Sequence, residues 1–293
     1  MTTIVVGMDG SDGARAALAW ACQEARREPG ANIVALSAWL SPVPATSPWV
    51  VGYDLPVDLT EATTAVLAES VAAVTANGFA DVPIEQRVVC GSAPAVLIAQ
   101  GNTADIVVVG SRGLGGFKEL LLGSVSHQVV THAPCPIVVV PRAVETADSK
   151  HASLTTIVVG VDGSPNSIAA LQWAAGRARL SDAVVHAVYA WQFPATATAL
   201  IGDGAASPEP IARAAGEALD GFIAAADLPN SVRVVPAVRE GSPAKVLLSQ
   251  AKEARLLVVG ARGHGGFVGL LLGSVASTVT HHAPCPVAVI PDK

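Results

Sequence analysis

Two glycine-rich stretches carry the residue types that bind phosphate groups. Residues 110–125 read Gly-Ser-Arg-Gly-Leu-Gly-Gly-Phe-Lys-Glu-Leu-Leu-Leu-Gly-Ser-Val, and residues 260–275 repeat them with four of sixteen positions changed. Each stretch follows an apolar run and precedes a helix-like sequence. Glycines let a backbone approach a ligand closely, and the N–H groups at a helix start attract anions. The pattern therefore predicts a phosphate-binding loop in each copy, in which the N–H groups of Gly123 and Ser124 and the Ser124 hydroxyl hold phosphate oxygens.

The spacing within the loops separates them from two better-known phosphate loops. Each copy has a glycine, two residues, a glycine, nine residues and a Gly-Ser pair: Gly110, Gly113, Gly123 and Ser124, then Gly260, Gly263, Gly273 and Ser274. No Lys-Ser/Thr follows the last glycine, as a Walker A loop requires. The Gly-x-Gly-x-x-Gly loop of dinucleotide folds follows a first strand, where this chain has Asp-Gly-Ser instead.

Charged residues accompany both loops. Asp9 and Asp162 each follow the first apolar run of their half, and Arg112 and Arg262 lie inside the loops. A guanidinium can neutralise phosphate charge or reach a ribose. A carboxylate can bind a hydroxyl or a base amine, or hold a Mg²⁺ ion that bridges phosphates. Asp-Gly-Ser is also ordinary turn chemistry, so a purely local role for the aspartates stays open.

The elements that must position these residues repeat as strand and helix. Apolar β-branched runs alternate with helix-like sequences, at residues 2–8, 33–39, 84–89, 105–109 and 137–140. Ser92 is expected to cap the helix that follows the third run. Such alternation predicts an α/β fold with a doubly wound parallel sheet, covered by helices on both faces. Ligands of such sheets bind at the carboxyl ends of the strands, where Asp9 and the residue 110 loop are expected.

The whole pattern occurs twice, so the chain is a duplication of two domains. Residues 162–164 repeat Asp-Gly-Ser of residues 9–11, and residues 282–286 repeat His-Ala-Pro-Cys-Pro of residues 132–136. Residues 142–154 are polar and lack periodicity. We therefore predict domains at residues 1–141 and 155–293, joined by a linker at 142–154.

Composition excludes several classes of function. Half of the 293 residues are hydrophobic, 14% are charged and the net charge is −6, which argues against nucleic acid or an anionic membrane surface as partner. No apolar run has the roughly 20 residues that span a bilayer, and the N-terminus lacks a signal-peptide pattern. The four cysteines do not have zinc or disulfide-framework spacing. A cytoplasmic protein is the expectation.

These features resemble the universal stress protein family in its tandem-domain, ATP-binding form. The resemblance rests on the two glycine patterns, on Asp9 and Asp162, and on Pro-Cys-Pro at 134–136 and 284–286. It implies Rossmann-like domains with five parallel strands in the order 3-2-1-4-5, and ATP, together with Mg²⁺, as the ligand. The implied nucleotide contacts are Asp9, Ala38, Gly110, Arg112, Gly113, Gly123, Ser124 and Val125, then Asp162, Ala190, Gly260, Arg262, Gly263, Gly273, Ser274 and Val275.

The two halves differ around the loops, so the two sites are expected to differ in affinity. Ser126 and His127 become Ala276 and Ser277, which removes a hydroxyl from the second site. Leu114 becomes His264, which is expected to add a phosphate donor, and Lys118 becomes Val268. The glycine frames are intact in both halves, so we predict that both bind.

The family resemblance also implies how the halves meet. Its subunits pair edge to edge through their last strands, and residues 137–140 and 287–290 are apolar runs of that kind. We predict that these strands pair within the chain as a pseudo-dimer. Whether two chains then form a homodimer is left open, as is the identity of any protein partner.

Several functions remain compatible with the residues. The leading hypothesis is an ATP-binding sensor or regulator of the stress response. No catalytic triad or phosphoryl-transfer lysine is evident, so catalytic residues are not assigned. A weak ATPase or phosphotransferase, a binder of another adenine nucleotide such as cyclic AMP, and a partner-binding module with vestigial sites are the alternatives.

Overall fold

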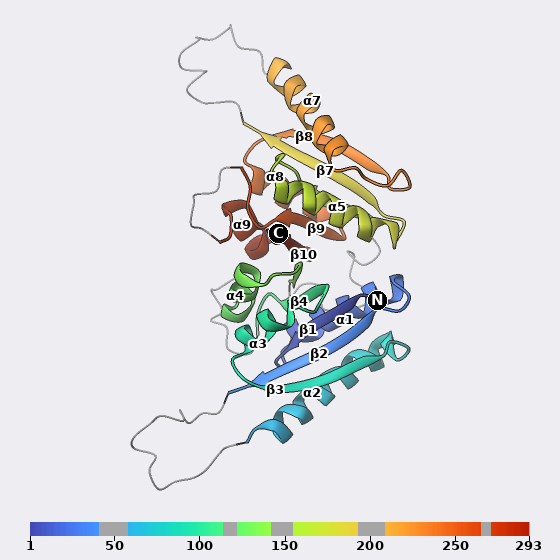
Figure 1. The fold of residues 1–293 in the computed structure, drawn as a ribbon, viewed down its shortest axis with the longest axis vertical. Coiled ribbons are helices and arrows are strands. Elements are labelled where there is room, and N and C mark those ends of the chain that lie inside the picture. The colour runs from blue at the N-terminus through green and yellow to red at the C-terminus, as the bar shows by residue number, and fades with distance from the viewer. Residues whose placement is uncertain (41–57, 114–121, 142–154, 193–208, 265–270, 293) are drawn as a thin grey trace, which may run out of the picture. The chain divides into compact units, whose positions relative to one another are not determined.

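The computed structural model describes residues 1–40, 58–113, 122–141, 155–192, 209–264 and 271–292. The chain divides into two compact units, Met1–Ala147 and Asp148–Lys293. The predicted linker at residues 142–154 lies outside the described residues. Each unit is an α/β domain with a parallel sheet, as the strand and helix alternation predicts (Figure 1).

The described residues of the first unit form five parallel strands, which pair in the order β3-β2-β1-β4-β5. Their bounds are β1 Thr3–Met8, β2 Asn32–Trp39, β3 Ile84–Cys90, β4 Ile106–Gly110 and β5 Ile137–Val140. Strands β4 and β5 are buried along their whole length, which explains why they read as continuous Val/Ile runs.

Helices cover both faces of this sheet. Their bounds are α1 Asp12–Arg27, α2 Thr60–Val74, α3 Ala93–Gln100 and α4 Ser124–His132. Helices α1 and α2 contact each other and pack on one face, whereas α3 and α4 contact each other and pack on the opposite face. Helix α2 passes into a π-helical turn, Thr75–Phe79, where Gly78 adopts a positive φ. The regular helical backbone thus closes at Asn77 and Gly78, whose φ/ψ values are not helical.

The second unit repeats this arrangement. Its strands are β6 Thr156–Gly160, β7 Val184–Trp191, β8 Val234–Glu240, β9 Leu256–Gly260 and β10 Val287–Ile290, and they pair in the order β10-β9-β6-β7-β8. Its helices are α5 Pro165–Arg179, α7 Glu209–Ala225, α8 Pro243–Gln250 and α9 Ser274–His282. Helices α5 and α7 cover one face and α8 and α9 the other (Figure 1).

Local sequence signals explain where the helices begin. Ser11 caps α1, because its Oγ accepts the Ala14 N–H at 3.2 Å, and Ser164 caps α5 in the same way through Ser167. Ser92 occupies the N-cap position of α3, but its side chain makes no capping hydrogen bond there. The expectation that the Ser92 side chain caps this helix was therefore wrong, although the helix begins where predicted.

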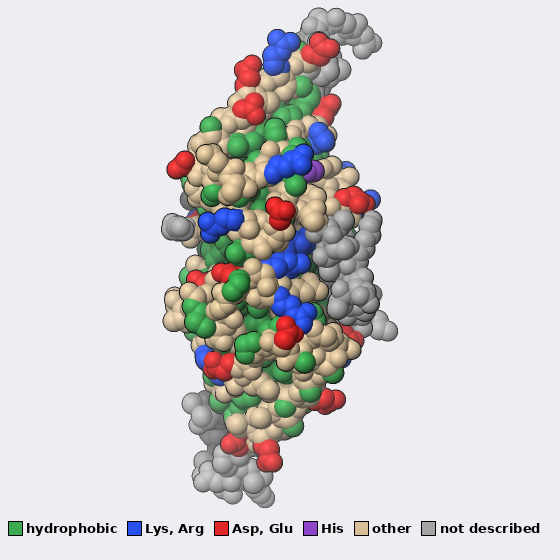
Figure 2. Space-filling view, turned by 90° about the vertical axis from the view of Figure 1, so that its right-hand side faces the viewer, with side chains coloured by type: hydrophobic (Ala, Val, Ile, Leu, Met, Phe, Trp, Pro, Cys, Tyr) green, Lys and Arg blue, Asp and Glu red, His purple; other side chains and the backbone are tan. Residues whose placement is uncertain are grey.

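The surface shows no single dominant side-chain type on the face drawn in Figure 2. Acidic and basic side chains are scattered there among hydrophobic and other residues. Within the described parts of the chain, no helix combines the length and the apolar character that crossing a bilayer demands.

Candidate functional site

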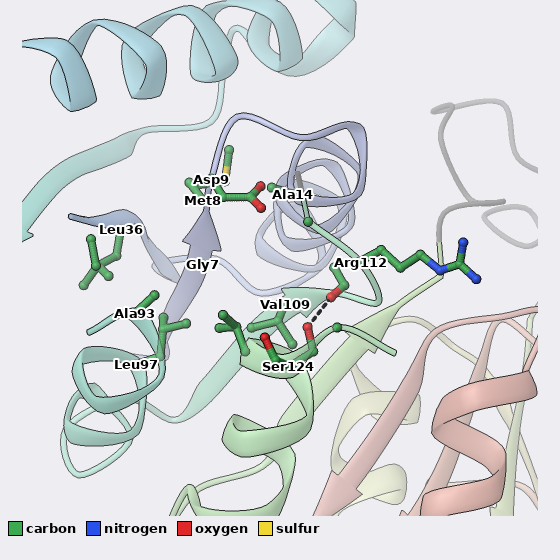
Figure 3. Close-up of a pocket in the computed structure, with 16 residues that line it drawn as sticks. Gly7, Met8, Asp9, Ala14, Leu36, Ala93, Leu97, Val109, Arg112 and Ser124 are labelled. Atoms are coloured by element: carbon green, nitrogen blue, oxygen red, sulfur yellow. Dashed lines mark hydrogen bonds between the residues drawn. The ribbon is translucent and has the colours of Figure 1, made fainter. Parts of the chain in front are cut away.

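A cavity of about 460 Å³ opens at the carboxyl ends of the strands in the first unit (Figure 3). Strand β1 contributes its last residues, β4 contributes Val109 and Gly110, and helices α3 and α4 contribute their first turns. The eight residues predicted for this half all line the cavity: Asp9, Ala38, Gly110, Arg112, Gly113, Gly123, Ser124 and Val125.

The second unit has a cavity of the same size, about 460 Å³, in the equivalent place. All eight residues predicted for this half line it: Asp162, Ala190, Gly260, Arg262, Gly263, Gly273, Ser274 and Val275. Residues that are far apart in the sequence meet here because parallel strands bring their carboxyl ends to one edge of the sheet.

One wall of each cavity is apolar, and the sequence pattern did not single out its residues. In the first unit this wall consists of Met8, Leu36, Ala93, Leu97 and Val109. Gly7 allows the wall to form, since a Cβ there would come within 3.0 Å of a Leu97 methyl group. The recurrence of this glycine as Gly160, against Leu247, was a signal available in the sequence. An apolar wall of this kind suits the face of a planar ring.

A glycine lies directly against the aspartate carboxylate in both cavities. A Cβ on Gly113 would overlap the Asp9 Oδ2 atom, and a Cβ on Gly263 would overlap the Asp162 Oδ2 atom. The second glycine of each loop is therefore required by close approach of the carboxylate. Gly10, next to Asp9, has φ +85°, a left-handed value that favours glycine in the turn.

Both aspartates also make local turn contacts, so the two roles considered for them occur together. The Ser11 N–H donates to Asp9 Oδ1 at 3.0 Å, and the Ser164 N–H donates to Asp162 Oδ1 at 2.9 Å. These hydrogen bonds orient each carboxylate toward the glycine loop. A turn cap and a ligand-facing carboxylate are thus compatible at the same residue.

The Asp162 carboxylate is held in its ionised form. Partial burial raises its pKa, but hydrogen bonds from Ser164, the His264 N–H and Ser167 outweigh burial and leave the pKa below its ordinary value of 3.8. The His264 N–H donates to Asp162 Oδ2 at 3.0 Å, and the His264 ring Nδ1 lies 3.9 Å from Oδ1. His264 therefore lies beside the Asp162 carboxylate.

The other loop positions that were predicted to differ between the halves are not described. They are Leu114, which matches His264, and Lys118, which matches Val268.

The starts of helices α4 and α9 present backbone N–H groups to the cavities. The first intrahelical hydrogen bond of α4 is from the His127 N–H to the Gly123 carbonyl, so the Ser124 and Val125 N–H groups precede it. The Gly123 N–H, however, donates to the Ser111 carbonyl at 2.8 Å. The prediction that the Gly123 N–H holds a phosphate oxygen was wrong, because this N–H closes the loop instead.

The same correction applies to the second unit, where the Gly273 N–H donates to the Ala261 carbonyl at 2.7 Å.

The Ser126 hydroxyl, which differs between the halves, is used within the protein in the first unit. The Ser126 Oγ is buried and donates to the Gly110 carbonyl at 2.6 Å, shown as the dashed line in Figure 3. Ala276 has no hydroxyl for the matching contact in the second unit.

Arg112 and Arg262 line the two cavities, but neither guanidinium is placed to contact a ligand there. Figure 3 shows the Arg112 side chain extending away from Asp9 and Ser124. The Arg262 guanidinium forms an ion pair with Asp292. The prediction that these arginines neutralise phosphate charge would therefore require each side chain to turn.

The described residues contain no group of three His, Cys, Asp or Glu side chains that could hold a metal ion by itself. A Mg²⁺ ion held by Asp9 or Asp162 would share that carboxylate with phosphate oxygens, which are usual Mg²⁺ ligands in nucleotide sites. The metal assignment stays a prediction.

Comparison with known proteins adds the family context. The sequence model of the universal stress protein family matches residues 1–141 and again residues 153–291. A universal stress protein of Mycolicibacterium smegmatis is 32% identical over 291 residues, which cover 98% of this chain and 96% of the relative. Universal stress protein Rv2623 of Mycobacterium tuberculosis is 31% identical over 293 residues, which cover 98% of this chain and 95% of that protein.

A solved structure shows the same fold over the whole chain. The crystal structure of a universal stress protein from Archaeoglobus fulgidus has a TM-score of 0.65, with 21% sequence identity, and covers 99% of this chain and 98% of its own. The two-domain architecture is therefore shared with a known structure.

Proposed function

Because this chain belongs to the universal stress protein family in its tandem-domain form, we propose that each domain binds one adenine nucleotide, foremost ATP with Mg²⁺. The observation that carries the proposal is the repeated cavity: in both units an apolar wall, an aspartate against a glycine, and a helix start surround the same volume. The protein would act in the cytoplasm as a sensor or regulator of the stress response.

The residues present fit such a ligand. The apolar wall of Leu36 and Leu97 suits the adenine ring, and the backbone of Ala38 lies at the end of β2 on the same side. The Ser124 and Val125 N–H groups suit phosphate oxygens, since a helix start favours anions. Asp9 suits a ribose hydroxyl or a Mg²⁺ ion held by phosphates. ATP would supply three linked phosphates whose charge or loss the protein can sense.

We place binding rather than turnover at the centre of the proposal. No lysine follows the last glycine of either loop, where other nucleotide sites place the lysine that assists phosphoryl transfer, and the carboxylate of each cavity already accepts a backbone N–H group. Slow ATP hydrolysis would show as ADP formation that Asp9→Asn and Asp162→Asn together abolish while binding persists. Competition between ATP and cyclic AMP separates the choice of nucleotide.

The first test is denaturation and mass analysis of the purified full-length protein, followed by titration with ATP and Mg²⁺. We expect close to two nucleotides per chain. No nucleotide in the purified protein, together with no heat of binding on titration, would contradict the proposal and direct attention to protein partners.

Glycine variants test the cavity itself. Gly113→Ala with Gly263→Ala is expected to abolish binding, at least a hundredfold loss, because each new methyl group displaces an aspartate carboxylate that also faces the ligand. Gly216→Ala in α7 is the matched control, since nothing lies within 4 Å of its Cβ position. Full binding by the double variant would contradict the assignment of these cavities.

A further inference from the structure

A carboxylate at the end of the chain distinguishes the second cavity. Arg262 lines this cavity, and its guanidinium is ion-paired with Asp292. The side-chain amide of Asn166 donates to the other oxygen of the same carboxylate. Strand pairing explains the contact: Ile290 of β10 is in register with Gly260 of β9, so residues two positions beyond each strand end lie together.

This network lies at the loop end of the cavity. The Gly260 Cα faces Asn166 so closely that a Cβ would lie 2.7 Å from the Asn166 Cβ. Asp292 therefore stands beside the point where β9 passes into the glycine loop, and Gly263 of that loop lies against Asp162. The second cavity thus has two carboxylates near its loop, one of which neutralises the loop arginine.

The first cavity lacks two members of this network. Gly13 occupies the position of Asn166, four residues after the aspartate, and has no side chain to contribute. The residue that follows the matching proline is Arg142, which lies outside the described residues, so the sequence has the opposite charge at that position. Among the described residues Arg112 has no carboxylate partner in an ion pair, and its side chain extends away from the cavity (Figure 3).

We propose that Asp292 is a specificity-determining residue that lowers the preference of the second cavity for nucleotides with several phosphates. An arginine already paired with a carboxylate attracts phosphate less, and every added phosphate brings negative charge toward Asp292. The inference rests on the proposed nucleotide binding. The first cavity discriminates strongly in favour of ATP over AMP, whereas the second accepts a nucleoside monophosphate nearly as well.

The parts of the cavities expected to contact a base and a ribose are similar in character, although Met8, Leu36 and Ala93 of the first wall are Val161, Val188 and Pro243 in the second. Both cavities have volumes of about 460 Å³, and both have an apolar wall and a glycine against an aspartate. AMP, with a single phosphate, is therefore expected to bind both with similar affinity.

Calorimetric titration of full-length chains with one cavity disabled measures each site. Gly263→Ala leaves the first cavity for measurement, and Gly113→Ala leaves the second. We expect ATP to bind the second cavity about tenfold more weakly than the first, with AMP affinities within about threefold of each other, as screened charge interactions near a surface allow.

A second pair of variants, which disable each cavity in another way, tests whether lost binding in the glycine variants comes from misfolding. Ser124→Pro and Ser274→Pro each remove one N–H and one hydroxyl at the first helical position, which proline tolerates. We expect the ATP and AMP affinities of each remaining cavity to be the same whether the other cavity is disabled by the glycine variant or by the proline variant. Circular dichroism and thermal melting establish that each variant remains folded.

Asp292 itself is tested in the chain whose first cavity is disabled. Asp292→Asn is expected to tighten ATP binding about tenfold and to change AMP binding less than twofold. Asp292→Arg, which introduces the residue type of the first half, is expected to tighten ATP binding further. Asp227→Asn is the matched control, because this exposed aspartate precedes β8 at the opposite edge of the sheet.

The outcomes separate this inference from the proposed function. An unchanged ratio of ATP to AMP affinity in Asp292→Asn, with two nucleotides still bound per chain, would overturn the role of Asp292 and leave the proposed function standing. An equal change in Asp227→Asn would also overturn it. Absence of any nucleotide binding would overturn both.

Discussion

At the scale of single residues, the site depends on how closely a carboxylate approaches a glycine. Asp9 faces Gly113 and Asp162 faces Gly263, in each case without room for a Cβ. Hydrogen bonds from Ser164 and the His264 N–H then keep the Asp162 carboxylate ionised. A carboxylate is thus held directly against a loop glycine in both units.

The ionisation of Asp162 makes a pH prediction. The folded-state pKa lies below the ordinary value of 3.8, so the unfolded state binds the proton more readily. The resulting stability is fully present above pH 3.8 and is lost as the pH falls through the folded-state pKa. We expect the difference in free energy of unfolding between wild type and Asp162→Asn to shrink below pH 3.8, as measured by urea unfolding from pH 6 to pH 2.5.

A difference that stays constant over this range would contradict the ionised, hydrogen-bonded state of Asp162. An NMR titration of the carboxyl carbon provides an independent check, because its midpoint should lie below 3.8.

At the scale of elements, helix starts position the site. Helices α1 and α5 begin directly after the Asp-Gly-Ser turns, and α4 and α9 begin directly after the glycine loops. Ser11 joins the first of these turns to its helix, since its Oγ accepts the Ala14 N–H. The glycine loop is closed separately, by the hydrogen bond from the Gly123 N–H to Ser111.

Capping at α1 can be measured against a matched serine. Ser11→Ala is expected to lower the free energy of unfolding of the first domain by about 1 kcal/mol, because the helix loses a capping hydrogen bond. Ser92→Ala at the start of α3 is expected to cost less than about half of that, since its side chain makes no such bond. Equal losses in urea unfolding would contradict the observed difference between the two caps.

At the scale of the whole molecule, the chain is two copies of one domain whose cavities have diverged in charge. The glycine frames and apolar walls are retained in both, whereas Asn166, His264 and Asp292 are features of the second half. Duplication would thus allow one chain to carry two nucleotide sites with different preferences.

The predicted pairing of the domains through their last strands stays a prediction, and it rests on the apolar edge strands and the family resemblance. We expect separately produced chains of residues 1–141 and 155–293 to associate one to one, because strands β5 and β10 would otherwise leave an apolar edge exposed. Light scattering after size-exclusion chromatography measures this. Two monomers that elute independently would contradict the pairing.

Much of the fold followed from the sequence because its signals are local. Continuous Val/Ile runs predicted the strands, and the Gly-Ser pairs at the ends of the glycine loops predicted where α4 and α9 begin. All sixteen candidate residues line the cavities because they lie at or just beyond the carboxyl ends of parallel strands, or at the helix starts that face this edge of the sheet. Periodicity and spacing within contiguous residues were sufficient for these features.

Other features required the tertiary structure, because they depend on contacts between distant segments. Only the packing of α3 on β1 shows that Leu97 forms a cavity wall against Gly7. Only the loop geometry shows that the Gly123 N–H is used within the protein. The register of β9 with β10 decides that Asp292 meets Arg262, thirty residues earlier in the chain. The sequence by itself determined which residues gather at the strand ends, and strand register and helix packing decided which of them touch.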